Sequence, residues 1–178
     1  MNIGIDIDGV LRDFCGQLKT VYNKVYPDHV ISEITDYELS PFFPIGKDIY
    51  DFFQIRFPYE VFELAKPFPG AKEFVNSLRQ NKIVIITNQK RGNEIYTLNW
   101  LTMHGIYYDS IVFTKEKNIA NIDVLIDDCD DNLKKANAFP VCFAQNWNEW
   151  SGIRTNDYKE IIKIINDIEH NKEIINED

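Results

Sequence analysis

The sequence begins with Met1-Asn2-Ile3-Gly4-Ile5-Asp6-Ile7-Asp8-Gly9, a short apolar run that ends in two carboxylates. Such a run is typical of a parallel strand buried on both faces, and the residues after it lie at the carboxyl edge of its sheet. Two later runs have the same form. Lys82-Ile83-Val84-Ile85-Ile86-Thr87-Asn88 ends in a hydroxyl and an amide, and Asp123-Val124-Leu125-Ile126-Asp127-Asp128 ends in two carboxylates. The three runs therefore predict three buried strands whose polar ends meet at one edge of a sheet.

The stretches between these runs have the spacing of amphipathic helices. Apolar residues recur every three or four positions over 70–80 and 94–104, and Gly105 ends the second stretch. Four further elements are expected: strands at 110–113 and 140–144, a short helix at 132–138 and a closing helix at 157–170. This alternation of strands and helices predicts an α/β fold with a doubly wound parallel sheet.

One long segment interrupts the alternation. Residues 14–26 have a helical pattern, and a stretch rich in Pro, Phe and Tyr follows before the next predicted helix. We therefore expect an α/β core formed by residues 1–13 and 68–178, with a small helical cap, residues 14–67, inserted after the first strand. Some of the cap's aromatic rings are candidates for stacking on a nucleobase, whereas most are expected to form the cap's own core.

The composition excludes several classes of function. The 28 acidic and 19 basic residues give a formal net charge of −9, so stable binding to duplex nucleic acid or to an anionic membrane is not expected. Cys15, Cys129 and Cys142 are scattered and lie far from the three histidines, which excludes the usual zinc-ligand spacing. Without a signal peptide or a long apolar run, the chain is expected to be cytoplasmic with free thiols.

The acidic strand ends point to a metal site. Asp6, Asp8, Asp127 and Asp128 would lie close together, and like charges at short range disfavour one another's ionisation unless a cation is present. Mg²⁺ prefers oxygen ligands of this kind. The alternative is that Asp127 and Asp128 cap the helix that follows them.

These residues resemble the haloacid dehalogenase superfamily of phosphotransferases. The resemblance rests on four motifs in the expected order: 6–11, the strand ending in Thr87, a lysine within 114–117, and 125–128. More narrowly, Asp8-Gly9-Val10-Leu11-Arg12-Asp13-Phe14 is similar to the start of the 5′(3′)-deoxyribonucleotidases, Asp-Gly-Val-Leu-Ala-Asp-Phe. Residues 143–148 resemble a Phe-x-x-Pro-Trp-Asn segment of relatives of that group, although Trp147, Asn148 and Trp150 are expected to be packing and turn residues.

The resemblance implies a chemical role for each carboxylate. Asp6 would be the nucleophile that attacks phosphorus, and Asp8 would protonate the leaving alcohol and then activate water. Mg²⁺ would be held by the Asp6 carboxylate, the Asp8 main-chain carbonyl and Asp127, with Asp128 nearby.

It also implies a phosphate site. Thr87 and the amide of Asn88 would hold phosphate oxygens, and Lys117 would neutralise the nucleophile and the developing charge. Lys115 is a competing candidate because it lies only two residues away, but Lys117 has the spacing to the acidic pair that the motif favours. The ring of Phe14 would face the base of the substrate.

Two departures from the nucleotidase pattern affect the substrate site. Arg12 stands where the pattern has a small residue, and its guanidinium is expected to bind a second phosphate, pair with Asp13 or face solvent. Thr97 stands where relatives carry a phosphate-binding lysine, for which Lys90 or Arg91 would compensate.

The sequence therefore predicts a magnesium-dependent phosphomonoesterase that forms an aspartyl-phosphate and acts as a 5′-nucleotidase on (deoxy)nucleoside monophosphates. The enzymatic alternatives are a related phosphatase for another small phosphate ester or for a nucleic-acid 3′-phosphate end. A non-enzymatic alternative is a receiver-like phosphoacceptor module, in which the acidic pair precedes the acceptor aspartate rather than following it. The expected partner is a small phosphorylated substrate, and a homodimer is one assembly that the sequence allows.

Overall fold

The computed structural model describes residues 1–176 and contains a six-stranded, fully parallel sheet. The strand order is β3-β2-β1-β4-β5-β6, so the N-terminal strand lies in the middle of the sheet, with Ile5 opposite both Ile85 and Ile126. This is the doubly wound α/β fold that the sequence predicts. The strands are β1 (Asn2–Ile5), β2 (Lys82–Thr87), β3 (Ser110–Phe113), β4 (Val124–Asp127), β5 (Phe139–Phe143) and β6 (Arg154–Thr155).

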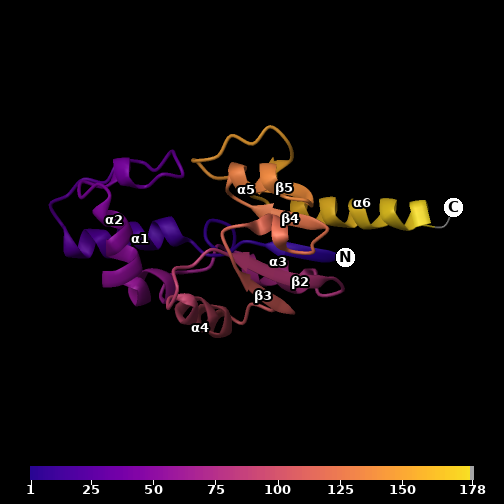
Figure 1. Ribbon diagram of the computed structural model, residues 1–178, viewed down its shortest axis with the longest axis horizontal. Coiled ribbons are helices and arrows are strands. Elements are labelled where there is room, and N and C mark those ends of the chain that lie inside the picture. Colours follow the sequence, from indigo (N-terminus) through magenta and orange to yellow (C-terminus); the bar gives the residue numbers. More distant parts are fainter. Residues whose placement is uncertain (177–178) are drawn as a thin grey trace.

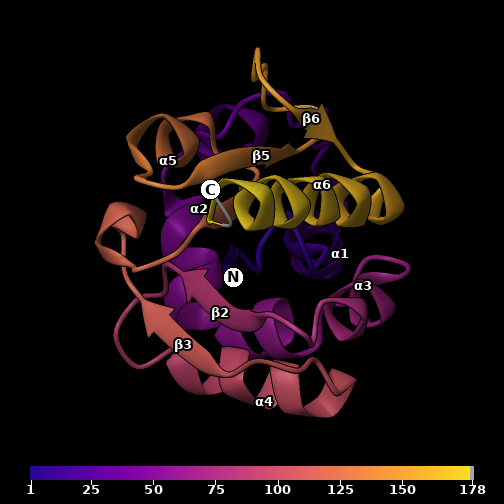
Figure 2. The same cartoon turned by 90° about the vertical axis from the view of Figure 1, so that its right-hand side faces the viewer.

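The apolar runs form strands because both faces of the sheet are covered. Side chains alternate along a strand, so Ile83 and Ile85 of β2 pack in one hydrophobic cluster, and Val84 and Ile86 pack in another on the opposite face. The first cluster contains residues of α3, α4 and α6, and the second contains Leu133 of α5. Figure 2 shows α5 and α6 on opposite sides of β5. The core helices are α3 (Ala71–Ser77), α4 (Glu94–His104), α5 (Asp130–Lys135) and α6 (Tyr158–Asn176).

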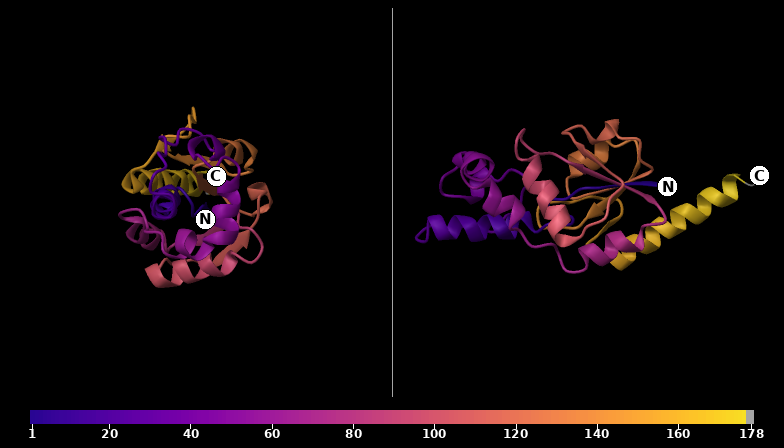
Figure 3. Two further views of the ribbon diagram at one scale, coloured as in Figure 1. Left: turned by 90° about the vertical axis from the view of Figure 1, so that its left-hand side faces the viewer. Right: turned by 90° about the horizontal axis from the view of Figure 1, so that it is seen from below.

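The segment between β1 and α3 lies beyond the carboxyl ends of the strands. It occupies one end of the molecule, and the N-terminus and the end of α6 lie at the other (Figures 1 and 3). We call residues 14–67 the cap segment. A hydrophobic cluster joins residues from the whole of this segment, including Leu18, Tyr22, Phe52 and Phe62. Its elements are α1 (Phe14–Val25), a 3₁₀ turn (Ser40–Phe42), α2 (Asp48–Asp51) and two π-helical turns (Phe52–Arg56 and Tyr59–Glu63).

Two short chain segments connect the cap segment to the sheet. They run beside each other, because the amide of Asp13 donates to the carbonyl of Lys66 at 2.9 Å and the amide of Phe68 donates to the carbonyl of Leu11 at 2.8 Å. These connections lie next to the predicted boundaries at 13/14 and 67/68. The division into a core and an inserted cap stays a prediction.

The structure differs from several predicted element bounds and contains one additional strand. The helix predicted at 132–138 begins at Asp130 and ends at Lys135, because the acidic first turn and basic last turn of α5 suit the helix dipole. The closing helix extends past 170 to Asn176, and the two-residue strand β6 has no sequence signal. The last residues of the predicted core, 177–178, lie outside the described residues.

Two expectations from composition can be compared with the structure. Cys15, Cys129 and Cys142 are free thiols, as predicted. Over residues 1–176, no helix has both the length and the apolar character needed to cross a membrane.

Candidate active site

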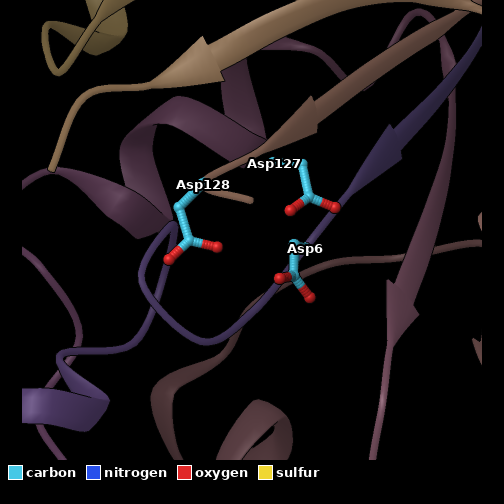
Figure 4. A group of neighbouring side chains, drawn as sticks. All are labelled: Asp6, Asp127 and Asp128. Carbon is cyan, nitrogen blue, oxygen red and sulfur yellow. The ribbon is translucent and has the colours of Figure 1, made fainter. Parts of the chain in front are cut away.

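Three carboxylates meet at the carboxyl edge of the sheet. Asp6 directly follows β1, Asp127 ends β4 and Asp128 comes next; because β1 and β4 are neighbours, their ends deliver these residues to one place. One oxygen of each carboxylate lies within 4.8 Å of the other two, and all three residues are buried. Figure 4 shows the three carboxylates facing a common space.

Lys117 places a positive charge within this cluster. It begins the 3₁₀ turn Lys117–Ile119, and its Nζ lies 2.9 Å from Asp6 Oδ2 and 2.6 Å from Asp127 Oδ2. Lys115 is exposed instead and lines the neighbouring cavity. Of the two candidate lysines, the structure therefore brings Lys117 into contact with Asp6.

Burial and charge shift the ionisation of the cluster. Burial, together with Asp127 and Asp8, raises the pKa of Asp6 to about 7, although Lys117 opposes the rise. Burial and the neighbouring carboxylates Asp6 and Asp127 also raise the pKa of Asp128. Burial lowers the pKa of Lys117, but Asp127 and Asp6 outweigh it and hold this pKa above its ordinary range. One lysine thus compensates the buried negative charge only in part.

The cluster has the ligand atoms that a hard divalent cation requires. Its ligand atoms are all oxygens, and Asp128 Oδ1 is a buried oxygen without a hydrogen-bond donor. Asp127 is oriented by the Cys129 amide at 2.9 Å and by Asn132 Nδ2 at 3.2 Å. Asp127 therefore accepts a hydrogen bond from a main-chain amide at the start of α5, as the capping alternative requires. Its other oxygen, however, accepts from Lys117.

Asp8 lies beside the cluster and faces a different partner. Arg12 Nε donates to Asp8 Oδ1 at 2.7 Å, Arg12 Nη2 donates to Asp8 Oδ2 at 3.0 Å, and Gln89 Nε2 donates to the same Oδ2 at 3.1 Å. The side chain of Arg12 is fully buried. The expectations that Arg12 faces solvent or pairs with Asp13 are therefore wrong, because Asp13 instead accepts from the amide of Gly16 and caps α1.

The loop from Ile7 to Arg12 explains this pairing. The amides of Leu11 and Arg12 both donate to the carbonyl of Ile7 at 2.8 Å, which folds the chain back and brings Arg12 beside Asp8. Gly9 in this loop has a φ of +81°, which a glycine adopts at little cost. A β-carbon there would collide with Asp128 Oδ2, so the loop also packs closely against the acidic cluster.

The predicted phosphate-site residues lie at the same sheet edge. Thr87 ends β2 and is buried, and Asn88 follows it and is exposed. Thr97 on α4, at the position of the lysine of relatives, is buried, and its Oγ1 contacts Arg12 Nη1 at 3.4 Å and Nη2 at 3.3 Å. Arg12 and Thr97, the two residues that depart from the nucleotidase pattern, are therefore in contact with each other.

A cavity of about 620 Å³ opens between the sheet edge and the cap segment. Asp8, Asn88, Lys90 and Asp128 line it from the sheet side; Arg91 is exposed and absent from the lining. Phe14 lies on its wall, stacked on Phe62 with ring centroids 5.6 Å apart. The aromatic lining residues are Phe14, Tyr37, Tyr50, Phe53, Phe62 and Trp147.

The expectation that Trp147 serves only packing is incomplete. Its Nε1 donates to Asp128 Oδ2 at 2.9 Å, so an indole from the β5–β6 loop orients a carboxylate of the cluster. Asn148 Nδ2 donates to the main-chain carbonyl of Asp128 at 2.8 Å. The resemblance of 143–148 to a nucleotidase segment was the available signal for Trp147. The contact between Gln89 and Asp8 was not predicted from the sequence. The position of Gln89 directly after Thr87 and Asn88 was the available signal for it.

The fold and this site define the class of protein. A hydrolase of the haloacid dehalogenase-like family from Streptococcus pneumoniae has a similar structure, with a TM-score of 0.65 at 13% identity over 92% of this chain and 97% of that one. A parallel sheet that gathers an aspartate nucleophile candidate, an acidic pair and a lysine is the arrangement of the haloacid dehalogenase superfamily, in agreement with the resemblance in the sequence.

The comparisons of sequence identify the family within this class. The family described as "5' nucleotidase, deoxy (Pyrimidine), cytosolic type C protein" matches residues 1–171, and the chain belongs to it. A "Putative 5'(3')-deoxyribonucleotidase" of Chlorobaculum tepidum is 30% identical over 162 residues, 82% of this chain and 80% of the relative. A 5′(3′)-deoxyribonucleotidase of Clostridium acetobutylicum is 28% identical over 167 residues, 89% and 91% of the two chains. The chain is thus a phosphoric monoester hydrolase of the 5′-nucleotidase type.

Proposed function

We propose that the chain is a magnesium-dependent phosphomonoesterase that acts through an aspartyl-phosphate intermediate. The observation that carries this proposal is the buried Asp6 carboxylate, 2.9 Å from Lys117 Nζ and grouped with Asp127 and Asp128. Nucleophile, counter-cation and metal ligands therefore occupy one edge of the sheet. A phosphoryl group at this edge would meet the nucleophile on one side and the cavity on the other.

In the first step, an oxygen of the Asp6 carboxylate attacks phosphorus. The bond between phosphorus and the leaving oxygen breaks, and the electron pair stays on that oxygen, which takes a proton from the carboxyl group of Asp8. Lys117 balances the negative charge of Asp6 and of the phosphoryl oxygens, and Thr87 and the amide of Asn88 hold those oxygens.

In the second step, water attacks the phosphorus of the aspartyl-phosphate. Asp8, now a carboxylate, accepts a proton of this water, and the bond between phosphorus and Asp6 breaks. The Asp6 carboxylate and inorganic phosphate result, so each cycle consumes one water and restores both carboxyl groups.

The acidic cluster would hold Mg²⁺ through Asp6, Asp127 and the main-chain carbonyl of Asp8, with Asp128 beside them. When bound, the ion neutralises the anionic nucleophile and the anionic substrate and so allows them to approach. An all-oxygen site with an unpaired buried oxygen on Asp128 supports this proposal.

Magnesium should stabilise the protein in a pH-dependent way. Because the pKa of Asp6 is about 7 in the folded chain and 3.8 is its ordinary value, the folded state keeps a proton that the unfolded state loses. Ionisation of Asp6 therefore costs stability as the pH rises from about 4 to about 7, and a bound cation offsets this cost above that range. Millimolar Mg²⁺ should raise the melting temperature by about 5 °C at roughly pH 8 and by less than about 1 °C at roughly pH 5.

Thermal unfolding with Mg²⁺ or with chelator at the two pH values measures this difference. Asp131→Asn, which changes an exposed carboxylate on α5, is the matched control and should keep the full magnesium effect. An equal magnesium effect at both pH values, or none at either, would contradict the proposed metal site.

We further propose (deoxy)nucleoside monophosphates as substrates. A cavity of about 620 Å³ with aromatic walls beside Asp8 has room for a nucleoside, and rings such as Phe14 and Trp147 are suited to stack on a base. The names of the two relatives support the same substrate class. The acidic net charge disfavours nucleic-acid 3′ ends, and a cytoplasmic location stays a prediction.

A phosphate-release screen tests the substrate. We expect kcat/KM for deoxyribonucleoside monophosphates to exceed that for sugar phosphates and phosphorylated oligonucleotide ends by about 100-fold, which a few stacking and shape contacts are able to provide. A sugar phosphate that ranks equal or higher would favour the alternative of another small ester. A chain that becomes phosphorylated once and releases no phosphate would favour the receiver-like alternative.

A further inference from the structure

We propose that Arg12 is a positioning residue that fixes the carboxylate of Asp8 and connects it to the cap segment. This inference rests on the proposed function, in which Asp8 gives a proton to the leaving group. It replaces the expectation that Arg12 binds a second phosphate of the substrate.

The guanidinium of Arg12 is fully used by contacts within the protein. Nε and Nη2 bind the two oxygens of Asp8 at 2.7 and 3.0 Å, Nη1 donates to the carbonyl of Phe62 at 3.0 Å, and both Nη atoms reach Thr97 Oγ1. These contacts supply an acceptor for every N–H of the group. Arg12 is also 0% exposed and is not among the residues that line the cavity, so it has no donor left for a substrate phosphate.

Arg12 touches three separate parts of the protein. Asp8 belongs to the loop after β1, Phe62 belongs to the cap segment, and Thr97 and Trp100 belong to α4. The guanidinium lies over the rings of Phe62 and Trp100, with its central carbon 5.2 and 5.3 Å from their centroids. Its own main chain pairs with Pro67 at the connection between the cap segment and the sheet. The side chain therefore links the cap segment to Asp8 directly.

The pairing determines how Asp8 faces the cavity. A guanidinium fork that binds both oxygens of a carboxylate fixes the plane of that carboxylate, which a single point charge does not. Gln89 adds a third donor on the same side. The side chain of Asp8 remains 24% exposed and lines the cavity. The free positions on its two oxygens, which carry the proton in the first step and accept one in the second, therefore face the substrate in one orientation. Loss of the fork would leave Asp8 in place but free to rotate.

The dependence of rate on the leaving group tests this role. An alkyl phosphate needs a proton on its leaving oxygen, whereas p-nitrophenyl phosphate has a leaving group that departs without one. For Arg12→Met, we expect kcat/KM to fall about 100-fold on the alkyl phosphate that the wild type hydrolyses fastest and less than about fivefold on p-nitrophenyl phosphate, because general acid catalysis contributes about 10² to 10⁴. Arg12→Lys should behave similarly, since an ammonium does not reproduce the fork.

A control variant separates this effect from loss of contacts between a guanidinium group and aromatic rings. Arg56 also contacts aromatic rings, those of Phe52 and Phe57, and it lies in the cap segment without a contact to Asp8. Arg56→Met should change kcat/KM on both substrates by less than about twofold. The slow second step, which also uses Asp8, should produce a burst of p-nitrophenol with Arg12→Met and not with Arg56→Met.

Thr97→Val covers the case in which the Arg12 variants do not fold. This change removes the hydroxyl that holds both Nη atoms but does not touch Asp8. It should lower kcat/KM on the alkyl phosphate by about tenfold and leave p-nitrophenyl phosphate nearly unchanged. Equal losses on both substrates, or no loss on either, would overturn the positioning role. If the wild type releases no phosphate from any ester with Mg²⁺, the proposed function fails instead, before Arg12 is tested.

Discussion

Asp6→Asn should lower phosphate release by about 10⁵-fold, the size of loss that follows when a nucleophile is removed. An amide has nearly the shape of the carboxylate but does not attack phosphorus. Asp6 is 6% exposed, lies 2.9 Å from Lys117 Nζ and follows the central strand, so the chain has little freedom to bring another oxygen to its place. The initial rate with p-nitrophenyl phosphate and with a nucleotide, at saturating Mg²⁺, measures the effect.

The same variant should fold well, which separates loss of chemistry from loss of structure. Burial and the neighbouring carboxylates make ionised Asp6 unfavourable in the metal-free protein and raise its pKa to about 7. Replacement by a neutral amide removes that cost, so metal-free Asp6→Asn should melt at or above the wild-type temperature at about pH 8. Asp131→Asn is the activity control and should stay within about twofold of the wild type. Asp6→Asn that retains more than about 1% of the rate would contradict its role as nucleophile.

The positions of Asp6, Thr87, Asp127 and Asp128 follow from the sequence because of one geometric rule. Buried parallel strands give near-continuous apolar runs, and the residue after each run must lie at the carboxyl edge of the sheet. The sequence shows three such runs, and the structure places all three strands side by side in the order β2-β1-β4. The acidic cluster is therefore predictable from strand ends alone, without knowledge of any side-chain contact.

The partner of Asp8 does not follow from this rule. Arg12 meets Asp8 because two amides share the carbonyl of Ile7 and Gly9 adopts a positive φ, a loop geometry without a repeating pattern. Its other partners, Phe62 and Thr97, are 50 and 85 residues away. Because two of the three segments that Arg12 contacts are distant in the sequence, its environment leaves no local signal. Three different environments for Arg12 were therefore compatible with the sequence, and two of them are wrong.

Trp147 illustrates a different reason for a missed contact. An indole in a turn packs in most proteins, and only the tertiary position of the loop after β5 shows that its N–H binds Asp128. The two-residue strand β6 and the π-helical turns of the cap segment also leave no signal in the sequence, because they are too short to show a hydrophobic period. Sequence patterns predict the sheet, and long-range packing determines the rest of the site.

Lys117→Met should have the second largest effect on the rate. The side chain of Lys117 is 3% exposed and bridges Asp6 and Asp127, whose carboxylates would otherwise repel each other and the phosphoryl group. Methionine keeps most of the volume and loses the charge. We expect the rate on both p-nitrophenyl phosphate and a nucleotide to fall by about 10³-fold. The variant lacks the buried ammonium group that stabilises the negative charge of the transition state, and this charge develops with either leaving group. This equal loss distinguishes Lys117 from Arg12, whose loss should depend on the leaving group.

Lys117→Met should also destabilise the metal-free protein, which Asp6→Asn should not. Removing one partner of a buried ion pair leaves uncompensated charge and costs about 3 to 5 kcal/mol. Urea unfolding at about pH 8 should show this loss with chelator and a smaller loss with millimolar Mg²⁺, because a bound cation takes over part of the compensation. Lys115→Met is the matched control, since Lys115 is exposed and lines the cavity without reaching the cluster. If Lys115→Met abolishes activity and Lys117→Met does not, the lysine of the phosphate site is Lys115, and the ion pairs of Lys117 serve the fold alone.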